Sequence, residues 1–275
     1  MSISIGPELL SQYARYSLYN SPYPSHDTGK AIDLYPGHST AYSPVSGTVI
    51  ECVTVGCPKT SYASPEDHLI LVDCDSYIAR ILHVEPWVDE DEVIQIGDPL
   101  GKLIRSGYFA RWVDPHIHLE FRPPGQNPIR AAGSVPIEIS QSPAPISWDG
   151  IGSIIEQGTT FIRLDAPVSP DSTPAALSTD QGYPLDGGVP HYDGGGILDT
   201  TASDGCISIL GTPIGTVTNQ RVEWESLVIL INDRPATGLS LFVSNKSFGI
   251  KIVFADGHPF RLGETVQVTI EAANE

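Results

Sequence analysis

The feature that most constrains the fold of this chain is its succession of short apolar runs, each bounded by Gly, Pro or Asp. In the first half these runs cover residues 30–35, 47–55, 68–74, 77–84, 93–96, 100–104 and 115–122. Runs of this length between turn residues are typical of β-strands. One short helix, of one or two turns, is expected to begin at Pro7 within residues 7–18. The pattern therefore predicts an all-β fold, with an antiparallel domain of the sandwich or barrel type.

The second half of the chain continues this pattern. Strands are predicted at 154–164, 206–210, 214–218, 226–232, 238–243, 248–254 and 265–271. A stretch rich in Ser, Pro and Ala separates the halves, so we predict a first domain at 1–132 and a second all-β domain at 133–275. Residues 168–196 are rich in Pro, Gly, Ser and Asp, and we expect a long loop there that is mobile or functional.

The chain is strongly acidic, with a formal net charge of -18 from 33 acidic and 15 basic residues. It has no basic stripe to hold a phosphate backbone, which argues against a nucleic-acid partner. An acidic excess keeps a protein soluble where salt is high, because salt screens the repulsion. We therefore hypothesise a halophilic protein, adapted to a salty cytoplasm; the alternative is an ordinary acidic protein.

The N-terminal residues contain neither the basic start nor the apolar core of a secretory signal, and no window is apolar enough for a membrane span. The expectation is a cytoplasmic protein with no membrane partner, and secretion stays open. Four cysteines lack the paired spacing of a cysteine zinc site: Cys52, Cys57, Cys74 and Cys206. A disulfide between Cys52 and Cys74 is compatible with the sequence but is not favoured without secretion.

Two histidines, His116 and His118, lie two residues apart in the apolar run 115–122. Alternate side chains of a strand share one face, and a rise of about 3.3 Å per residue separates their Cα atoms by roughly 6–7 Å. Two protonated imidazoles this close would repel each other, whereas a metal binds them in the neutral form. The alternative interpretation is an exposed pair on an edge strand.

Upstream, His26 lies in a polar turn, and Asp33 lies in the apolar run that follows it. With His118 they provide two imidazoles and one carboxylate, which leaves the fourth position of a tetrahedral zinc ion for water. Zinc lowers the pKa of such a water and polarises a carbonyl group. A hydrolase also needs a base and an oxyanion donor, and His83 and His116 are two further imidazoles for these tasks.

Five sequence elements together resemble the lysostaphin-type (LytM-like) zinc metallo-endopeptidases, a family with a duplicated-hybrid-motif β fold. They are the His26…Ile32-Asp33-Leu34 start, Ser43–Val49, Leu82-His83-Val84, Ile96–Gly101 and His116–Phe121, in the family's order within about residues 20–125. The resemblance implies one Zn²⁺ per chain, bound by His26, Asp33 and His118. It also implies that His83 and His116 are the catalytic pair that positions water and stabilises the oxyanion. Members hydrolyse peptide bonds, often in bacterial cell-wall cross-bridges.

Three departures from the family pattern bear on the site. Six residues separate His26 from Asp33 where the family commonly has three, so the assignment of His26 as a ligand is the least secure. Ile81 occupies a position where the family usually has tyrosine, and Tyr19 or Tyr23 is a candidate for assisting the oxyanion. Residues 133–275 resemble no accessory domain.

The function that follows is a zinc-dependent metallo-endopeptidase that acts on a peptide or a peptide-containing polymer. Two alternatives stay open: a non-catalytic peptide- or glycan-binding module on the same scaffold, and a zinc hydrolase of a non-peptide amide. Two other histidines are weaker candidates. His38 is expected to be a solvated loop residue, and His191 with Asp193 is a candidate for capping the cleft. The sequence does not predict the oligomeric state.

Overall fold

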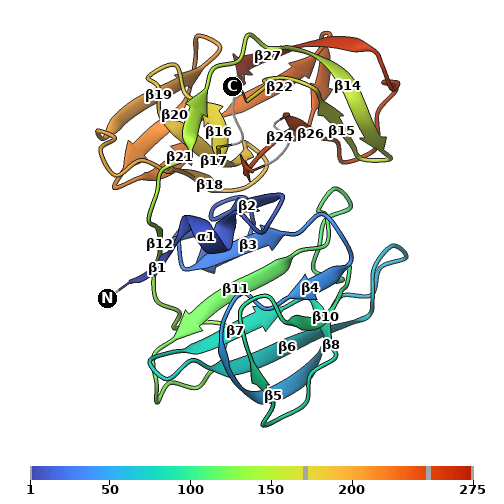
Figure 1. Ribbon diagram of the computed structural model, residues 1–275. Helices are drawn as coiled ribbons and strands as arrows, with labels where there is room; N and C mark the ends of the chain where they lie inside the picture. Colours follow the sequence, from blue (N-terminus) through green and yellow to red (C-terminus); the bar gives the residue numbers. More distant parts are fainter. Residues whose placement is uncertain (1, 170–172, 246–248, 274–275) are drawn as a thin grey trace. The chain divides into compact units, whose positions relative to one another are not determined.

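The computed structural model describes residues 2–169, 173–245 and 249–273 (Figure 1). The chain is nearly all β and divides into two compact units. The N-terminal unit comprises residues up to Tyr16 together with Gly29–Ser140, and the C-terminal unit comprises Ser17–Thr28 together with the chain from Gln141 onward. The segment Ser17–Thr28, which precedes the first predicted strand, therefore groups with the C-terminal half, which the sequence pattern did not indicate.

The N-terminal unit contains one helical turn, α1, and a set of strands. In chain order these elements are β1 (Ile3–Ile5), α1 (Pro7–Leu10), β2 (Arg15–Ser17), β3 (Ala31–Tyr35), β4 (Thr40–Tyr42), β5 (Gly47–Gly56), β6 (Glu66–Asp73), β7 (Ile78–Leu82), β8 (Val84–Pro86), β9 (Val93–Ile94), β10 (Pro99–Leu103), β11 (Ile117–Arg122) and β12 (Ile137–Ile139).

The main sheet of this unit pairs its strands antiparallel in the order β9-β5-β6-β7-β11-β3 (Figure 1). A small antiparallel sheet has the order β4-β10-β8, and β1 pairs with β12 in parallel. Every residue of β3 and β11 is buried. Burial on both faces explains why these two strands read as continuous apolar runs, and it makes each polar side chain within them conspicuous.

One local expectation is confirmed and two need correction. The helix expected to begin at Pro7 with one or two turns does begin there and ends at Leu10, after one turn. The strand expected over 77–84 is broken at His83, whose φ of 68° lies in the left-handed region and separates β7 from β8. The strand expected over 115–122 begins at Ile117, so His116 precedes the strand that carries His118.

The C-terminal unit contains one helical turn, α2 (Pro24–Asp27), and a second all-β assembly. Its strands are β13 (Ala144–Ile146), β14 (Ile151–Gly158), β15 (Phe161–Leu164), β16 (Ala175–Ser178), β17 (Pro184–Val189), β18 (Gly194–Ile197), β19 (Gly205–Ile209), β20 (Thr212–Thr218), β21 (Arg221–Trp224), β22 (Leu227–Ile231), β23 (Arg234–Ala236), β24 (Gly238–Leu241), β25 (Val243–Ser244), β26 (Lys251–Val253) and β27 (Thr265–Ala272). A single apolar cluster runs through this unit, from Ile154 to Ile270.

The long loop expected over 168–196 instead contains strands, since β16 and β17 lie inside it and β18 begins there, while residues 170–172 lie outside the described residues. The glycines that suggested a loop give room for aromatic rings. A Cβ on Gly195 would lie 2.2 Å from the Trp224 ring, and one on Gly196 would lie 2.2 Å from the Tyr19 ring. Residue 248, the start of the strand predicted over 248–254, lies outside the described residues.

Two further findings concern the whole sequence. All four cysteines are free thiols, so the Cys52–Cys74 disulfide is not formed. Among the described residues, no helix has the length and apolar character needed to cross a membrane.

Candidate metal and catalytic centre

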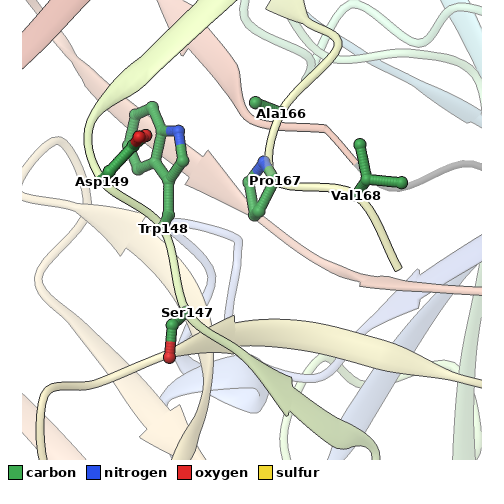
Figure 2. Close-up of a pocket in the computed structure, with 6 residues that line it drawn as sticks. All are labelled: Ser147, Trp148, Asp149, Ala166, Pro167 and Val168. Carbon is green, nitrogen blue, oxygen red and sulfur yellow. The ribbon is translucent and has the colours of Figure 1, made fainter. Parts of the chain in front are cut away.

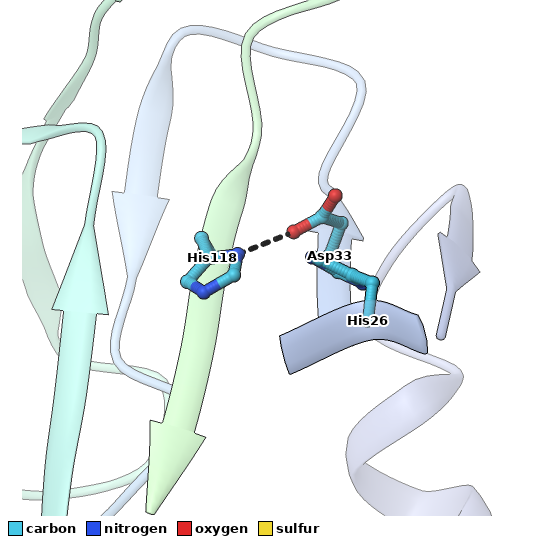
Figure 3. Close-up of side chains that lie close together, drawn as sticks. All are labelled: His26, Asp33 and His118. Atoms are coloured by element: carbon cyan, nitrogen blue, oxygen red, sulfur yellow. Dashed lines mark hydrogen bonds and ion pairs between the residues drawn. The ribbon is translucent and has the colours of Figure 1, made fainter. Parts of the chain in front are cut away.

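The register of three neighbouring strands creates the centre. On β11, His118 lies directly opposite Asp33 of β3 on one side and Leu82 of β7 on the other. The imidazole Nδ1 of His118 is 2.9 Å from Oδ1 of Asp33 (Figure 3). The next residue after Leu82 is His83, so the same pairing brings three of the predicted site residues to one point on the sheet.

His118 has a carboxylate at each ring nitrogen. While Nδ1 faces Asp33, Nε2 is 2.9 Å from Oε1 of Glu120, two residues along β11. Burial by itself would lower the pKa of His118, but the hydrogen bonds to Asp33 and Glu120 and their charges outweigh it and raise the pKa to about 9. Two carboxylates around one buried imidazole therefore form a site that stabilises a positive charge, either a proton on the ring or a metal ion.

Glu120 is itself held by a buried network. Its Oε2 contacts Arg80 of β7 and accepts a hydrogen bond from the Ser134 hydroxyl, and Arg122 lies 3.5 Å away. Burial opposes ionisation of Glu120, yet its bonds to His118 and the Arg80 charge keep its pKa well below the usual range. Glu120 is thus an anion with a fixed position, and it fixes the orientation of the His118 ring.

His26 lies on α2, which begins at Pro24 and is a single turn long. Its side chain is fully buried, and Nδ1 donates a hydrogen bond of 2.7 Å to the carbonyl oxygen of Leu18. A carbonyl can only accept, so this bond places the ring proton on Nδ1 and makes Nε2 the ring nitrogen that carries the lone pair. His26, Asp33 and His118 each offer one ligand atom, and these atoms lie within 4.8 Å of one another (Figure 3).

His116 approaches the same carboxylate from the other oxygen. Its Nε2 is 3.4 Å from Oδ2 of Asp33, while its Nδ1 donates a 2.8 Å hydrogen bond to the carbonyl of Asp114. Burial lowers the pKa of His116 to about 4, and the nearby Asp33 charge only partly opposes this. His116 is therefore a neutral imidazole at pH 7. It lies one residue before β11 and not within the strand.

His83 is the fourth imidazole of the centre. Its ring centroid lies 5.2 Å from that of His116 and 5.8 Å from that of His118. Its Nδ1 lies 2.7 Å from Oδ2 of Asp67, a buried carboxylate on β6. Phe109 packs between two of these rings, stacked on His116 and edge-on to His83, with 4.6 Å between centroids in both cases.

Sequence reasoning missed several members of this centre: Asp67, Ser106, Phe109, Glu120 and Ser134. Glu120 had the strongest available signal, because alternation on β11 puts it on the same face as His118. Asp67, by contrast, has no sequence spacing relative to His83 that would have identified it.

Four other candidates were named from the sequence: His38, His191, Tyr19 and Tyr23. His38 is exposed and packs edge-on against Tyr42. His191 is partly buried in the turn between β17 and β18, packed against Gly188 and Gly238, and desolvation lowers its pKa to about 4. Tyr19 packs against Gly196, and burial followed by the Asp186 charge raises its pKa to about 12. Tyr23 is partly exposed.

The C-terminal unit has an open pocket of a different character, in which the Trp148 ring and the Pro167 ring line a shallow hollow (Figure 2). Its remaining lining residues are Ser147, Asp149, Ala166 and Val168. Asp149 is the one titratable side chain among these six, so this pocket lacks the paired acid and base groups of a hydrolytic centre.

The ligand atoms of His26, Asp33 and His118 fit a zinc ion. Two imidazoles and one carboxylate are the ligand types of a catalytic zinc site with one open position. Both histidines have a ring nitrogen occupied by an oxygen acceptor, Leu18 for His26 and Glu120 for His118, as metal-binding histidines usually do. The cation would also supply the positive charge that Asp33 and Glu120 require.

Comparison with known proteins gives a family but no activity. Residues 4–139 match "Domain of unknown function (DUF8155) N-terminal domain", and residues 144–271 match "Domain of unknown function (DUF8155) C-terminal domain". No curated protein matches the chain.

Two solved structures are similar at a low level. The NMR solution structure of lysostaphin is 11% identical with a TM-score of 0.28, covering 90% of this chain and 96% of that one. The antimicrobial peptidase lysostaphin from Staphylococcus simulans is 13% identical with a TM-score of 0.28, covering 95% of this chain and 96% of that one.

Proposed function

We propose that this chain, which belongs to the DUF8155 family, is a zinc-dependent metallo-endopeptidase that hydrolyses peptide bonds with an activated water. The observation that carries the proposal is that one buried cluster contains both a set of possible metal ligands and additional imidazoles. His26, Asp33 and His118 form a group able to hold a metal, and His83 and His116 are two further imidazoles beside it. The five sequence elements that resemble lysostaphin-type peptidases contain these same residues.

Zinc held by His26, Asp33 and His118 would supply a Lewis acid that acidifies water and polarises the scissile carbonyl. The chain's own residues account for the rest. Glu120 and the Leu18 carbonyl orient the two histidine ligands, and Asp33 contributes negative charge. His83 has Nδ1 held by Asp67, which leaves Nε2 for proton transfer, while His116 has Nδ1 held by the Asp114 carbonyl and Nε2 3.4 Å from the proposed ligand Asp33.

The acidic composition favours a neutral or cationic substrate, because a strongly anionic polymer would be repelled. A peptide or a peptide-containing polymer is the proposed substrate class. Cleavage specificity would depend on the residues around the cluster, among which Phe109 provides an apolar wall against His83 and His116.

The test combines metal analysis with a substrate screen. Purified protein is analysed by inductively coupled plasma mass spectrometry and is incubated with a broad peptide library whose products are sequenced. We expect close to one zinc per chain and cleavage of internal peptide bonds that a chelator abolishes and added zinc restores. Tight binding of a peptide class without cleavage would replace the proposal with a binding module. Hydrolysis confined to non-peptide amides would retain the zinc centre and change the substrate.

A further inference from the structure

Asp67 is a buried carboxylate to which the proposed function assigns no role. It lies on β6 with none of its surface exposed. Its Oδ2 accepts hydrogen bonds of 2.7 Å from His83 Nδ1 and 2.7 Å from the Ser106 hydroxyl, and its Oδ1 accepts one of 2.8 Å from the backbone N–H of His68. Burial opposes ionisation, but the hydrogen bonds from His83, Ser106 and the His68 N–H keep the pKa of Asp67 low. A buried carboxylate with this many donors is a fixed anion.

The backbone of His83 is fixed as firmly as its ring. Its φ of 68° is uncommon for a residue other than glycine, and such strain persists only where the surroundings enforce it. The His83 N–H donates to the His68 carbonyl at 3.2 Å, and the His83 carbonyl accepts from Ile104 N–H at 3.0 Å. Two successive residues of β6, Asp67 and His68, thus hold the ring and the main chain of His83 together.

His83 and His116 differ in what holds them. The partner of His116 Nδ1 is the neutral carbonyl of Asp114, whereas the partner of His83 Nδ1 is the Asp67 carboxylate. A carbonyl fixes a tautomer, but a carboxylate also stabilises the imidazolium that forms when the ring takes up a proton. The two imidazoles are therefore suited to different tasks.

We propose that Asp67 is the positioning residue for His83: it holds the proton on Nδ1, so that the Nε2 lone pair accepts a proton from the attacking water. This assignment rests on the proposed function and divides the catalytic pair, making His83 the general base. The water oxygen bonds to the carbonyl carbon as its proton moves to Nε2. That proton then passes to the amide nitrogen as the C–N bond breaks, which gives one carboxyl and one amine product, while Asp67 stays ionised throughout.

Asp67→Asn tests this assignment because the surroundings dictate how the new amide must lie. The His68 N–H requires an acceptor where Oδ1 now lies, so the amide oxygen occupies that position and the amide NH₂ faces His83 and Ser106. An N–H facing Nδ1 forces the His83 proton onto Nε2. The variant thus keeps the shape of the site and removes the lone pair that the base needs.

The measurement has a spectroscopic arm and a kinetic arm, both on the zinc-loaded full chain labelled with ¹⁵N. Long-range ¹H–¹⁵N correlation spectra of the imidazoles report which nitrogen carries the proton, with His83→Gln used to assign the signals. We expect wild-type His83 to carry the proton on Nδ1 and Asp67→Asn to move it to Nε2. In the kinetic arm, kcat falls by roughly 10²–10⁴-fold with little change in KM. Asp73→Asn, the same change at an exposed position of β6, serves as the matched control with wild-type spectra and rates.

The outcomes separate this inference from the proposed function. Wild-type His83 protonated on Nε2 alone overturns the inference without any variant, even if Asp67→Asn does not fold. A kcat within about twofold of wild type in a folded Asp67→Asn also overturns it while leaving the peptidase intact. If the wild type cleaves no peptide but the tautomer switches as expected, the proposed function fails and the positioning of His83 by Asp67 stands.

Discussion

Asp33 is shared by two imidazoles, His118 at Oδ1 and His116 at Oδ2. The two rings nevertheless differ in the number of negatively charged groups around them. His118 lies between two carboxylates, whereas His116 has one carboxylate and one neutral carbonyl. A cation at this point is stabilised chiefly by the groups around His118, which is why we propose it as the ligand and His116 as its neighbour.

At the residue scale, zinc content and turnover should separate under two substitutions. His118→Ala removes a proposed ligand and leaves Glu120 without its partner, so zinc affinity and activity should both be lost. His83→Ala removes no proposed ligand, so zinc should stay near one per chain while turnover falls by about a hundredfold or more. Zinc content by mass spectrometry and rates on the same samples give the comparison.

His38→Ala is the control for both substitutions, because it removes an exposed imidazole that is not in the cluster. It should match the wild type in zinc and turnover. If His116→Ala releases the metal and His118→Ala does not, the two residues have exchanged roles. Loss of zinc in a folded His83→Ala would make His83 a ligand instead of a base.

At the element scale, a buried carboxylate anchors the segment that carries His26. Asp186 of β17 accepts hydrogen bonds from the Ser17 hydroxyl at 2.7 Å and from the backbone N–H groups of Leu18 at 2.6 Å and Tyr19 at 3.0 Å. Leu18 in turn supplies the carbonyl that orients His26. The position of His26 is therefore set by a strand far along the chain.

Two substitutions of Asp186 should have different effects. Asp186→Ala leaves two buried N–H groups without acceptors, which costs on the order of 1–3 kcal/mol each. Asp186→Asn retains an oxygen for them and should remain near wild type. We expect weaker zinc binding for Asp186→Ala, measured by competition with a chelator. Equal zinc affinity in the two variants would show that this carboxylate does not govern His26.

Asp186 should also make the stability of the folded protein depend on pH, which a comparison of wild type with Asp186→Asn can reveal. Burial raises the pKa of Asp186 to about 6, against an ordinary value of 3.8, although its three hydrogen bonds oppose this. The folded state therefore holds a proton that the unfolded state has lost, and the stability this contributes disappears as pH rises through about 6. Urea denaturation of wild type and Asp186→Asn should show wild type losing stability relative to the variant between pH 5 and 7.5. A constant difference over that range would contradict the raised pKa.

How far the sequence reveals these elements depends on the interaction that forms each one. Strands β3, β5, β6 and β11 were predictable because burial imposes a local apolar pattern. The break at His83 was not, because its left-handed backbone is enforced by contacts with His68 and Ile104 that lie outside any local window. The strands within 168–196 were misjudged as loop because glycines there serve packing against Trp224 and Tyr19.

In the candidate site, too, some residues were predictable from local sequence and others depend on contacts between distant segments. His26, Asp33, His83, His116 and His118 were recognisable as candidates from motif order, and the structure gathers them into one cluster. The residues that orient them, Asp67 and Glu120 among others, act through hydrogen bonds across strands. Such partners are specified by sheet register, which is a property of the assembled sheet and not of the spacing within one segment.

At the scale of the whole molecule, the dominant feature is the net charge of -18. Self-repulsion of this size destabilises a compact state at low ionic strength, and screening relieves it because the Debye length falls from about 10 Å at 0.1 M to about 3 Å at 1 M. We propose that the chain is adapted to high salt, and the thermal midpoint should then rise between low and molar salt. Calorimetry in potassium chloride measures this, and a midpoint that is flat or falls would leave the acidic excess as ordinary surface composition.

The pairing of β3 with β11 brings together side chains 85 residues apart in the chain. Contacts of such long range form late in folding, because the intervening loop must close before they yield any stabilisation. In an unfolded or partly folded chain the proposed zinc ligands are therefore far apart and can bind zinc only one at a time. In the native sheet they lie together and can bind it jointly. Metal uptake during refolding would then follow closure of this strand pair, and zinc in excess would slow unfolding without speeding the earlier steps of folding.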